Sequence, residues 1–214
     1  MRAAAPWRRG LYFVTPDRTD TAVLLLLAEQ ALAGGASLLQ YRNKSADGTT
    51  RHAQASALQA LALRAEVPLI INDDVRLAAA VGAAGVHLGR DDGDIASVRA
   101  MLGAAAIIGA SCYASIDAAR RAASGGASYV AFGAVFPSGT KPAAARAPLE
   151  LFRQAGDLGL PRVAIGGINI DNAGIVVAAG ADLIAVVSAV ADAPEPRTMA
   201  ARLSALFDSN GPTA

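Results

Sequence analysis

Short apolar runs alternate along the chain with longer alanine-rich stretches, and each apolar run is nearly continuous. Continuous apolar runs of this length are typical of parallel strands that are covered on both faces. We expect strands at residues 11–15, 37–42, 68–73, 85–89, 106–111, 129–135, 161–167 and 183–189. We expect helices at residues 21–35, 50–66, 74–83, 95–104, 115–126, 149–159, 171–180 and 196–209. Several of these helical stretches end in glycine, which commonly terminates a helix.

Eight strands that alternate with eight helices predict an α/β fold, a single (β/α)8 TIM barrel with its ligand sites at the C-terminal ends of the strands. The main alternative is an open doubly wound sheet, which usually has fewer strands and a glycine-rich turn after the first one. Here the first expected strand is followed by PDRTD, so the barrel is favoured. We expect residues 1–10 to be an N-terminal extension, 11–208 the barrel domain and 209–214 a disordered tail.

Composition and charge narrow the classes of protein further. The formal net charge is +1 and there is no long basic run, which argues against a nucleic-acid or membrane-surface partner. Cys112 is the single cysteine, so no internal disulfide can form, as suits a reducing cytoplasm. The N-terminus has no apolar signal region, and VLLLLA is too short to span a bilayer. We expect a soluble cytoplasmic protein that acts on small molecules, and a homo-oligomer is compatible with the sequence.

Polar residues gather at the C-terminal ends of the expected strands, where a barrel places its chemistry. The strand starts, at Pro68, Gly85, Ala106 and Pro161, carry no comparable set. The residues that follow the strand ends are Gln40, Arg42 and Lys44; Asn72, Asp73 and Asp74; Arg90, Asp91 and Asp92; Ser111; and Ser138, Thr140 and Lys141. Each residue alone is weak evidence for a functional site, whereas the convergence of all of them on one rim is stronger evidence.

Charge indicates the chemistry of this rim. Asp73 and Asp92 end neighbouring strands, and Mg²⁺ is commonly held by one or two carboxylates together with phosphate oxygens and water. Arg42, Lys44 and Lys141 are cations that can reach the same region. Acids combined with cations suit a metal–diphosphate complex. Asp74 and Asp91 are interpreted instead as residues that start helices.

A second set of residues predicts a separate phosphate site. TIM-barrel phosphate sites are often built from the loops after strands seven and eight. Gly166 and Gly167 lie in the first of these loops, and Val187 and Ser188 in the second. Glycine lets backbone N–H groups approach phosphate oxygens, although a glycine-rich turn without a ligand is the simpler reading of the pair alone.

Taken together, these segments resemble the thiamine phosphate synthase family, also called thiamine-phosphate pyrophosphorylases. The likeness runs from LYFVT to AVVSAV, and its specific pieces are QYRNK, IINDD, GVHLGRDD, IIGAS, FGAVFPSGTK and AIGGI. The resemblance implies a transferase that joins 4-amino-2-methyl-5-(diphosphooxymethyl)pyrimidine to 4-methyl-5-(2-phosphooxyethyl)thiazole, or to its carboxylated form. The products are thiamine phosphate and diphosphate.

The resemblance also implies the role of each site residue. Diphosphate and pyrimidine contacts are implied for Gln40, Tyr41, Arg42, Asn43, Lys44, Asn72, Ser111 and Lys141, of which Arg42, Lys44, Ser111 and Lys141 stabilise the departing diphosphate. Mg²⁺ ligands are implied at Asp73 and Asp92. Thiazole phosphate contacts are implied for Ser138, Gly139, Thr140, Gly167, Val187 and Ser188. Because an aminopyrimidine stabilises a cation on its CH₂ group, we expect a Mg²⁺-assisted dissociative substitution.

The chain departs from the family pattern at three points. It has GRDD where the family usually has GQED, so Arg90 replaces a glutamine and the contact of that glutamine is in doubt. Ser138 replaces a usual threonine and keeps the hydroxyl. SCYAS stands where SCH is common, and the sequence offers no interpretation of this change.

The two histidines and the cysteine have structural interpretations, and other functions are compatible with parts of the sequence. We expect His52 to be exposed, His87 to have a structural role and Cys112 to pack in the core. A thiazole tautomerase shares the fold but needs no metal for diphosphate, whereas Lys44, Asp73, Asp92 and Lys141 are all present here. A phosphate-binding lyase or a synthase of aromatic or histidine biosynthesis would need a Schiff-base lysine or a Glu/Asp acid–base pair inside the barrel, and the mid-strand positions offer neither. A non-catalytic barrel that binds thiamine precursors is compatible with the sequence.

Overall fold

The computed structural model describes residues 8–90, 92–137 and 146–208. The strands are β1 (Gly10–Val14), β2 (Leu38–Tyr41), β3 (Leu69–Asn72), β4 (Gly85–Leu88), β5 (Ile107–Tyr113), β6 (Tyr129–Phe132), β7 (Arg162–Ile165) and β8 (Leu183–Val186). The helices are α1 (Thr21–Ala33), α2 (Gly48–Arg64), α3 (Val75–Val81), α4 (Ile95–Leu102), α5 (Ile116–Ser124), α6 (Glu150–Gln154), the 3₁₀ turn η1 (Gly156–Leu158), α7 (Ala173–Ala178), α8 (Ser188–Ala191) and α9 (Pro196–Ala205).

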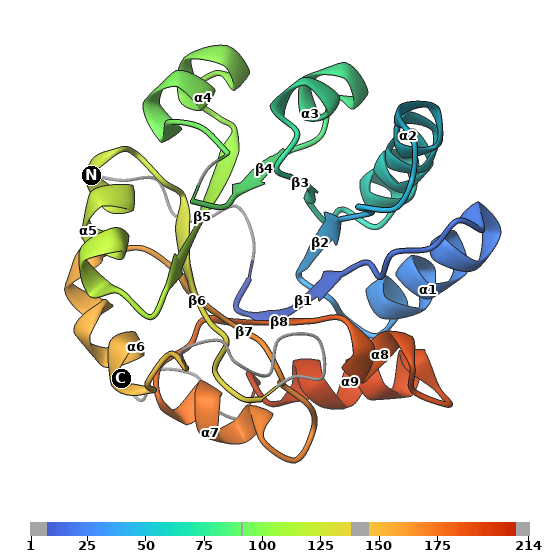
Figure 1. Cartoon of the computed structure of the whole chain (residues 1–214). Coiled ribbons are helices and arrows are strands. Elements are labelled where there is room, and N and C mark those ends of the chain that lie inside the picture. Colours follow the sequence, from blue (N-terminus) through green and yellow to red (C-terminus); the bar gives the residue numbers. More distant parts are fainter. Residues whose placement is uncertain (1–7, 91, 138–145, 209–214) are drawn as a thin grey trace.

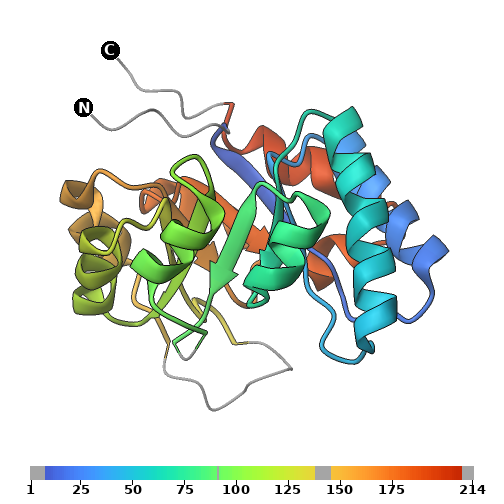
Figure 2. The ribbon, with the colours of Figure 1, turned by 90° about the horizontal axis from the view of Figure 1, so that it is seen from above.

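The eight strands pair in parallel and in chain order, and β1 pairs with β8 to close the barrel. Phe13, for example, lies opposite Leu39 on one side and Val186 on the other. Figure 1 looks along the barrel and shows the helices as an outer ring around the strands. In the perpendicular view of Figure 2, the helices lie beside the strands on both sides of the barrel. The predicted (β/α)8 TIM barrel is therefore confirmed.

Strand alternation divides the apolar residues into two clusters. The larger cluster lies between the strands and the helices and includes Phe13, Leu39 and Phe132. The smaller one fills the inside of the barrel with residues at the alternate strand positions, such as Tyr12, Leu38 and Val163. Successive side chains point to opposite faces of a strand, so each strand serves both clusters.

Aspartate and serine side chains start five of the helices. Asp20, Asp47, Asp74, Asp94 and Ser115 each accept hydrogen bonds from backbone N–H groups of the first turn. Such caps satisfy donors that have no partner within the helix. The prediction that Asp74 starts a helix is confirmed, while Asp94 caps α4 and the predicted helix-start residue Asp91 lies outside the described residues.

The observed elements differ from the expected ones mainly at their ends. The expected strand 183–189 stops at Val186, because the chain turns at Val187 into the short helix α8. The expected helix 149–159 is split into α6 and η1 at Gly156, and glycine is a poor helix former. β1 begins at Gly10, one residue inside the expected extension 1–10. Residues 1–7 of that extension and the expected tail 209–214 lie outside the described residues.

None of the helices in the described ranges is long and apolar enough to cross a membrane. Cys112 is buried and His52 is exposed, as predicted. Burial raises the pKa of the Cys112 thiol to about 11, so this cysteine is an apolar packing residue at neutral pH.

Candidate active site at the C-terminal mouth of the barrel

A cavity of about 650 Å³ opens at the C-terminal end of the barrel, and all eight strands or the loops that follow them contribute to its wall. Nine of the predicted site residues line it: Gln40, Arg42, Lys44, Asn72, Asp73, Asp92, Ser111, Val187 and Ser188. Parallel strands bring their C-terminal ends to one rim, which explains why residues that are 148 positions apart in sequence, as Gln40 and Ser188 are, meet here. Ser138, Gly139, Thr140 and Lys141 lie outside the described residues.

Two carboxylates lie next to one another at the mouth, at the ends of the neighbouring strands β3 and β4. Asp73 follows β3, and its pKa is raised, first by burial and then by the neighbouring Asp92 carboxylate. Asp92 also accepts a 2.7 Å hydrogen bond from the backbone N–H of Gly89. Two nearby carboxylates that disfavour each other's ionisation are stabilised by a cation between them. Their oxygen donors fit Mg²⁺, which binds through one or two carboxylates and leaves its other positions to phosphate and water.

The backbone at Asp73 is held in an unusual conformation. Its φ is +61°, in the left-handed region that few residues other than glycine adopt. The backbone N–H of Asp73 donates a 2.9 Å hydrogen bond to the carbonyl of His87 on β4, and Asp74 starts α3 directly afterwards. The strand end is therefore fixed from both sides, and it directs the Asp73 carboxylate into the cavity.

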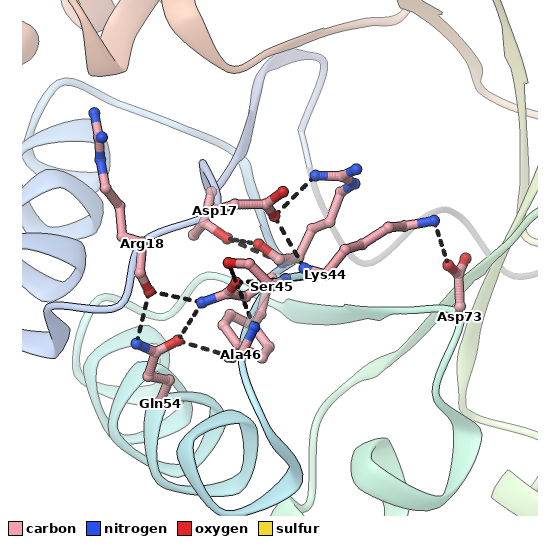
Figure 3. Close-up of polar contacts among 11 residues, drawn as sticks. Asp17, Arg18, Lys44, Ser45, Ala46, Gln54 and Asp73 are labelled. Carbon is pink, nitrogen blue, oxygen red and sulfur yellow. Dashed lines mark hydrogen bonds and ion pairs between the residues drawn. The ribbon is translucent and has the colours of Figure 1, made fainter.

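Each of the two cations at the end of β2 forms an ion pair with one acidic residue of the described part of the chain. Arg42 Nη1 lies 3.0 Å from Asp17 Oδ1, and Lys44 Nζ lies 3.3 Å from Asp73 Oδ2. Figure 3 shows Lys44 extending from the end of β2 toward Asp73. Asp17 also accepts a 3.0 Å hydrogen bond from the backbone N–H of Lys44, so this carboxylate links the β1 loop to both cations. Exposed ion pairs of this kind contribute little to stability, so the cations can exchange these partners for a ligand at small cost.

Gln54 of α2 fixes the loop that carries these cations. It is fully buried, its Oε1 accepts from Tyr41 OH at 2.9 Å and from Asn43 Nδ2 at 3.0 Å, and its Nε2 donates to the carbonyl of Arg18. The side chain of Asn43 also accepts from Ser45 and from the backbone N–H of Ala46 (Figure 3).

Tyr41 and Asn43 consequently differ from the other residues of the QYRNK segment. Their side chains are buried against α2 and do not line the mouth cavity, because side chains alternate along β2. Burial raises the pKa of Tyr41 to about 12. Their side chains shape the loop that presents Arg42 and Lys44, and they line a neighbouring pocket that shares Lys44 and Asp73 with the mouth cavity. Their predicted contact with substrate stays a prediction.

A chain of hydrogen bonds crosses the inside of the barrel below the mouth. Gln40 Nε2 donates to Tyr12 OH at 2.6 Å, and Tyr12 OH lies 2.8 Å from Tyr129 OH. Tyr129 OH lies 2.9 Å from His87 Nδ1, and His87 Nε2 lies 2.8 Å from Ser111 Oγ. The chain joins five strands and connects two of the predicted substrate contacts, Gln40 and Ser111.

Sequence reasoning missed Tyr12 and Tyr129 and assigned His87 only a structural role. Burial lowers the pKa of His87 to about 4 and raises the pKa of both tyrosines, so the three rings are uncharged at neutral pH. The available signal was strand alternation: Tyr12 and His87 fall on the inward positions of their strands, together with Gln40 and Ser111.

Gly109 on β5 makes room for Tyr129. A Cβ atom at Gly109 would lie 2.0 Å from Cζ of the Tyr129 ring, closer than any real contact. The ring is in turn stacked against His87, with centroids 5.6 Å apart and an interplanar angle of 18°. The hydrogen-bond chain is thus held by packing as well as by its polar contacts.

The opposite side of the mouth carries the predicted thiazole phosphate contacts. Val187 and Ser188 line the cavity, whereas Gly167 lies in the loop after β7 and is not one of the lining residues. Gly167 has a φ of +65°, and a Cβ there would lie 2.4 Å from the carbonyl oxygen of Pro137. A side chain at Gly167 would therefore displace the backbone of Phe136 and Pro137 after β6, which makes this glycine necessary for the shape of the site.

The departures from the family pattern at Arg90 and in SCYAS meet in space. The guanidinium carbon of Arg90 lies 4.9 Å from the centroid of the Tyr113 ring, at cation–π distance. Both residues line the mouth cavity, and the Tyr113 side chain is partly exposed there. The two substitutions therefore form one paired feature of the rim, which places an additional cation near Asp92.

A (β/α)8 barrel with acids and cations gathered at its C-terminal mouth defines a class, the barrel enzymes that bind phosphorylated small molecules. Comparison with known proteins then gives the family. The model of the family described as thiamine monophosphate synthase matches residues 11–190. The chain belongs to this family, and it is a transferase of thiamine biosynthesis.

The similar proteins agree with this assignment. A thiamine-phosphate synthase of Methylobacillus flagellatus is 56% identical over 207 residues, which cover 97% of this chain and 99% of that protein. One of Chromobacterium violaceum is 57% identical, with coverage of 94% and 98%. A solved structure of thiamine phosphate pyrophosphorylase from Pyrococcus furiosus superposes with a TM-score of 0.83 at 35% identity, and the match covers 94% of this chain and 96% of that one. More distant barrels, such as 3-hexulose-6-phosphate synthase at 18% identity and a TM-score of 0.68, share only the fold.

Proposed function

We propose that the chain joins 4-amino-2-methyl-5-(diphosphooxymethyl)pyrimidine to 4-methyl-5-(2-phosphooxyethyl)thiazole, or to its carboxylated form, and releases diphosphate and thiamine phosphate. With the carboxylated form, CO₂ is released as well. The observation that carries this proposal is the meeting of two cations, Arg42 and Lys44, with two carboxylates, Asp73 and Asp92, at one mouth. Carboxylates alone would repel a diphosphate, so the combination supports a metal–diphosphate ligand. The proposal includes a cytoplasmic location.

Asp73 and Asp92 are the proposed holders of Mg²⁺. Once bound, the ion would neutralise negative charge on the diphosphate oxygens. Lys44 now forms an ion pair with Asp73, and it can turn from this carboxylate to the diphosphate because its side chain is 61% exposed. Asn72 precedes Asp73 and offers an uncharged polar group to the same region of the cavity.

The reaction is proposed to be a dissociative substitution. The thiazole nitrogen attacks through its lone pair, so no group has to remove a proton from the nucleophile. The residues then have two tasks, to stabilise charge on the leaving diphosphate and to hold the thiazole close to the CH₂ carbon. Arg42, Lys44 and Ser111 are proposed for the first task together with Lys141, which lies outside the described residues.

Val187 and Ser188, supported by the loop that contains Gly167, are proposed to hold the thiazole phosphate. Ser138, Gly139 and Thr140 are proposed for the same phosphate, and they lie outside the described residues. Separate places for diphosphate and monophosphate on opposite sides of the mouth would leave the two reacting centres between them.

The direct test is to mix both substrates with Mg²⁺ and to measure released diphosphate and formed thiamine phosphate. Both products should appear in equal amounts, and both should vanish when the thiazole or the metal is omitted. Isomerisation of a thiazole without release of diphosphate would indicate a tautomerase. Binding of both precursors without turnover would indicate a sensor.

A second experiment tests the dissociative path. An electron-withdrawing group on the pyrimidine destabilises a cation at the CH₂ carbon, so single-turnover rates should fall steeply. An unchanged or faster rate would contradict the dissociative mechanism and leave the substrates as assigned.

A further inference from the structure

The hydrogen-bond chain inside the barrel connects the two sides of the proposed pyrimidine diphosphate site. Gln40 and Ser111, its two ends, both line the mouth cavity. Its three middle members, Tyr12, Tyr129 and His87, link these ends through four hydrogen bonds between residues of five strands. Each link is between 2.6 and 2.9 Å long, so each is a good hydrogen bond.

One direction of donation, beginning at the Gln40 amide, satisfies every link of this hydrogen-bond chain. A hydroxyl has one proton to donate, and Tyr12 OH already accepts from the amide of Gln40. In the direction of donation that begins at the Gln40 amide, Tyr12 donates its proton to Tyr129 OH, and Tyr129 donates its proton to Nδ1 of His87. A neutral imidazole with an accepting Nδ1 carries its proton on Nε2, which then donates to Ser111 Oγ.

This direction determines what the two ends offer to a ligand. Ser111 Oγ accepts from His87, so its own proton is available for an oxygen in the cavity. Gln40 uses its N–H on Tyr12, and its Oε1 has no hydrogen-bond partner among the described residues. One end of the chain can thus donate to an anion while the other accepts from an N–H group.

We propose that Tyr12, Tyr129 and His87 are positioning residues that fix this direction, so that Ser111 donates to the leaving diphosphate and Gln40 accepts from the amino group of the pyrimidine. The inference rests on the proposed function and deepens it. The hydrogen-bond chain is held rigidly: both tyrosines are at most 1% exposed, and their rings pack edge to face, with centroids 6.0 Å apart and an interplanar angle of 89°. Gly109 leaves the space that the Tyr129 ring occupies.

The opposite direction of hydrogen-bond donation would remove both proposed ligand contacts, that of Ser111 and that of Gln40. If the Gln40 amide turned by 180°, its oxygen would accept from Tyr12, and every later donor would reverse. Nδ1 of His87 would then carry the proton, and Ser111 would donate to Nε2 and present only lone pairs to the diphosphate. The two directions are therefore distinguishable by the tautomer of one imidazole.

The first experiment reads that tautomer by ¹⁵N NMR of the histidine rings in the free enzyme at neutral pH. The chain has only two histidines, and the exposed His52 can be assigned with a His52→Gln variant. We expect the proton of His87 on Nε2, with a hydrogen bond at Nδ1. A proton on Nδ1, or a charged ring, would overturn the inference. This measurement needs no substrate, so its result is independent of whether the proposed reaction occurs.

The second experiment compares two substitutions of the same residue. Glutamine at position 87 can place an amide N–H near the former Nε2 and keep the donor to Ser111, whereas asparagine places its amide near Nδ1. We expect His87→Asn to lower kcat about a hundredfold, the typical loss of one oriented donor, with a much smaller change in the KM of the thiazole phosphate. His87→Gln should retain about tenfold more kcat than His87→Asn.

Equal losses in the two variants, at equal melting temperatures, would show a merely structural histidine. If either variant fails to fold, Tyr129→Phe provides the alternative, since it keeps the ring that packs against His87 and removes the link to Nδ1. In that variant the Nε2 tautomer should lose its dominance and kcat should fall. An unchanged tautomer with unchanged kcat would contradict the inference, and His52→Gln should behave like the natural chain throughout.

A substrate analogue tests the Gln40 end of the hydrogen-bond chain. Tyr12→Phe removes the acceptor that orients the Gln40 amide, so the enzyme should discriminate less between the 4-amino pyrimidine and its 4-oxo analogue. A preference for the amino substrate that is unchanged in Tyr12→Phe would remove Gln40 from the proposal. Absence of diphosphate release by the natural chain would instead contradict the proposed function, whatever the tautomer.

Discussion

The two ends of the barrel use charge in different ways. At the N-terminal end of the strands, Asp182 receives three hydrogen bonds from Arg162, at distances of 2.8 to 3.3 Å, and the two side chains are only 19% and 22% exposed. Arg99 donates there to the carbonyls of Gly103, Ala106 and Gly126. At the C-terminal end, Lys44 and Asp73 make a single contact of 3.3 Å and are 61% and 31% exposed.

The difference between these two ion pairs indicates which charged residues of the barrel are available to bind a ligand. Charges whose hydrogen bonds are used within the protein stabilise the barrel, since a multiply bonded, partly buried pair is costly to break. Charges that keep a single, exposed contact contribute little to stability and remain able to bind a ligand. Substitutions at the two ends should therefore separate into losses of activity and losses of stability.

The largest expected effect is at the carboxylate pair of the mouth. Asp73→Asn or Asp92→Asn removes one charged Mg²⁺ ligand, and we expect kcat/KM to fall by about a hundredfold to a thousandfold with the unfolding free energy nearly unchanged. Steady-state kinetics over a range of Mg²⁺ concentrations and a thermal melt check this. Asp94→Asn is the matched control, because asparagine also caps a helix and Asp94 only starts α4. Near-native turnover of either variant at low Mg²⁺ would show the metal assignment to be wrong.

A smaller loss of substrate binding is expected when the buried Gln54, which holds the loop of Arg42 and Lys44, is replaced. Gln54→Leu leaves Tyr41 and Asn43 without their common acceptor, so the loop that holds Arg42 and Lys44 should lose its geometry. We expect the KM of the pyrimidine diphosphate to rise about tenfold, which corresponds to about 1.4 kcal/mol of lost binding. Gln59→Leu, on the same helix but bonded to the carbonyl of Gly82, should leave this KM unchanged. Equal effects of the two variants would refute a specific role for Gln54.

At the other end the expected loss is in stability. Asp182→Asn weakens the contacts with Arg162, and we expect about 2 kcal/mol of lost unfolding free energy, or a melting temperature lower by about 6 °C. Chemical denaturation and substrate titration would be measured on the same preparation. The KM values should not change, because this pair is remote from the mouth cavity. A changed KM with unchanged stability would break the distinction between the two ends.

The smallest expected effect concerns Arg90 and Tyr113. Arg90→Gln restores the residue usual in the family and removes one exposed cation, so we expect the KM of the pyrimidine diphosphate to rise about two- to fivefold at low salt. The difference should disappear at high salt, since exposed charges are screened. Tyr113→Phe keeps the ring beneath the guanidinium and should change little, whereas Tyr113→Ala should resemble Arg90→Gln. A salt-independent effect would point to a steric role.

Much of the site was predictable because all strands of a parallel barrel bring their C-terminal ends to the same rim. Once eight strands were assigned from their apolar runs, Gln40, Asp73, Asp92 and Ser111 had to meet at one rim, and they do. The sequence did not distinguish the five residues of the QYRNK segment from one another. The structure does, because side-chain alternation directs Tyr41 and Asn43 toward Gln54 while Gln40, Arg42 and Lys44 line the mouth cavity.

The sequence by itself determined the barrel, the family and the end of the barrel that carries the chemistry, because these follow from periodicity, segment order and local motifs. The tertiary structure alone decided which groups touch. It joined Arg90 to Tyr113, placed Gln54 beneath the cation loop and linked Gln40 to Ser111 through Tyr12, Tyr129 and His87. These contacts depend on strand stagger, on side-chain direction and on the space left by Gly109, and none of these is a property of a local segment.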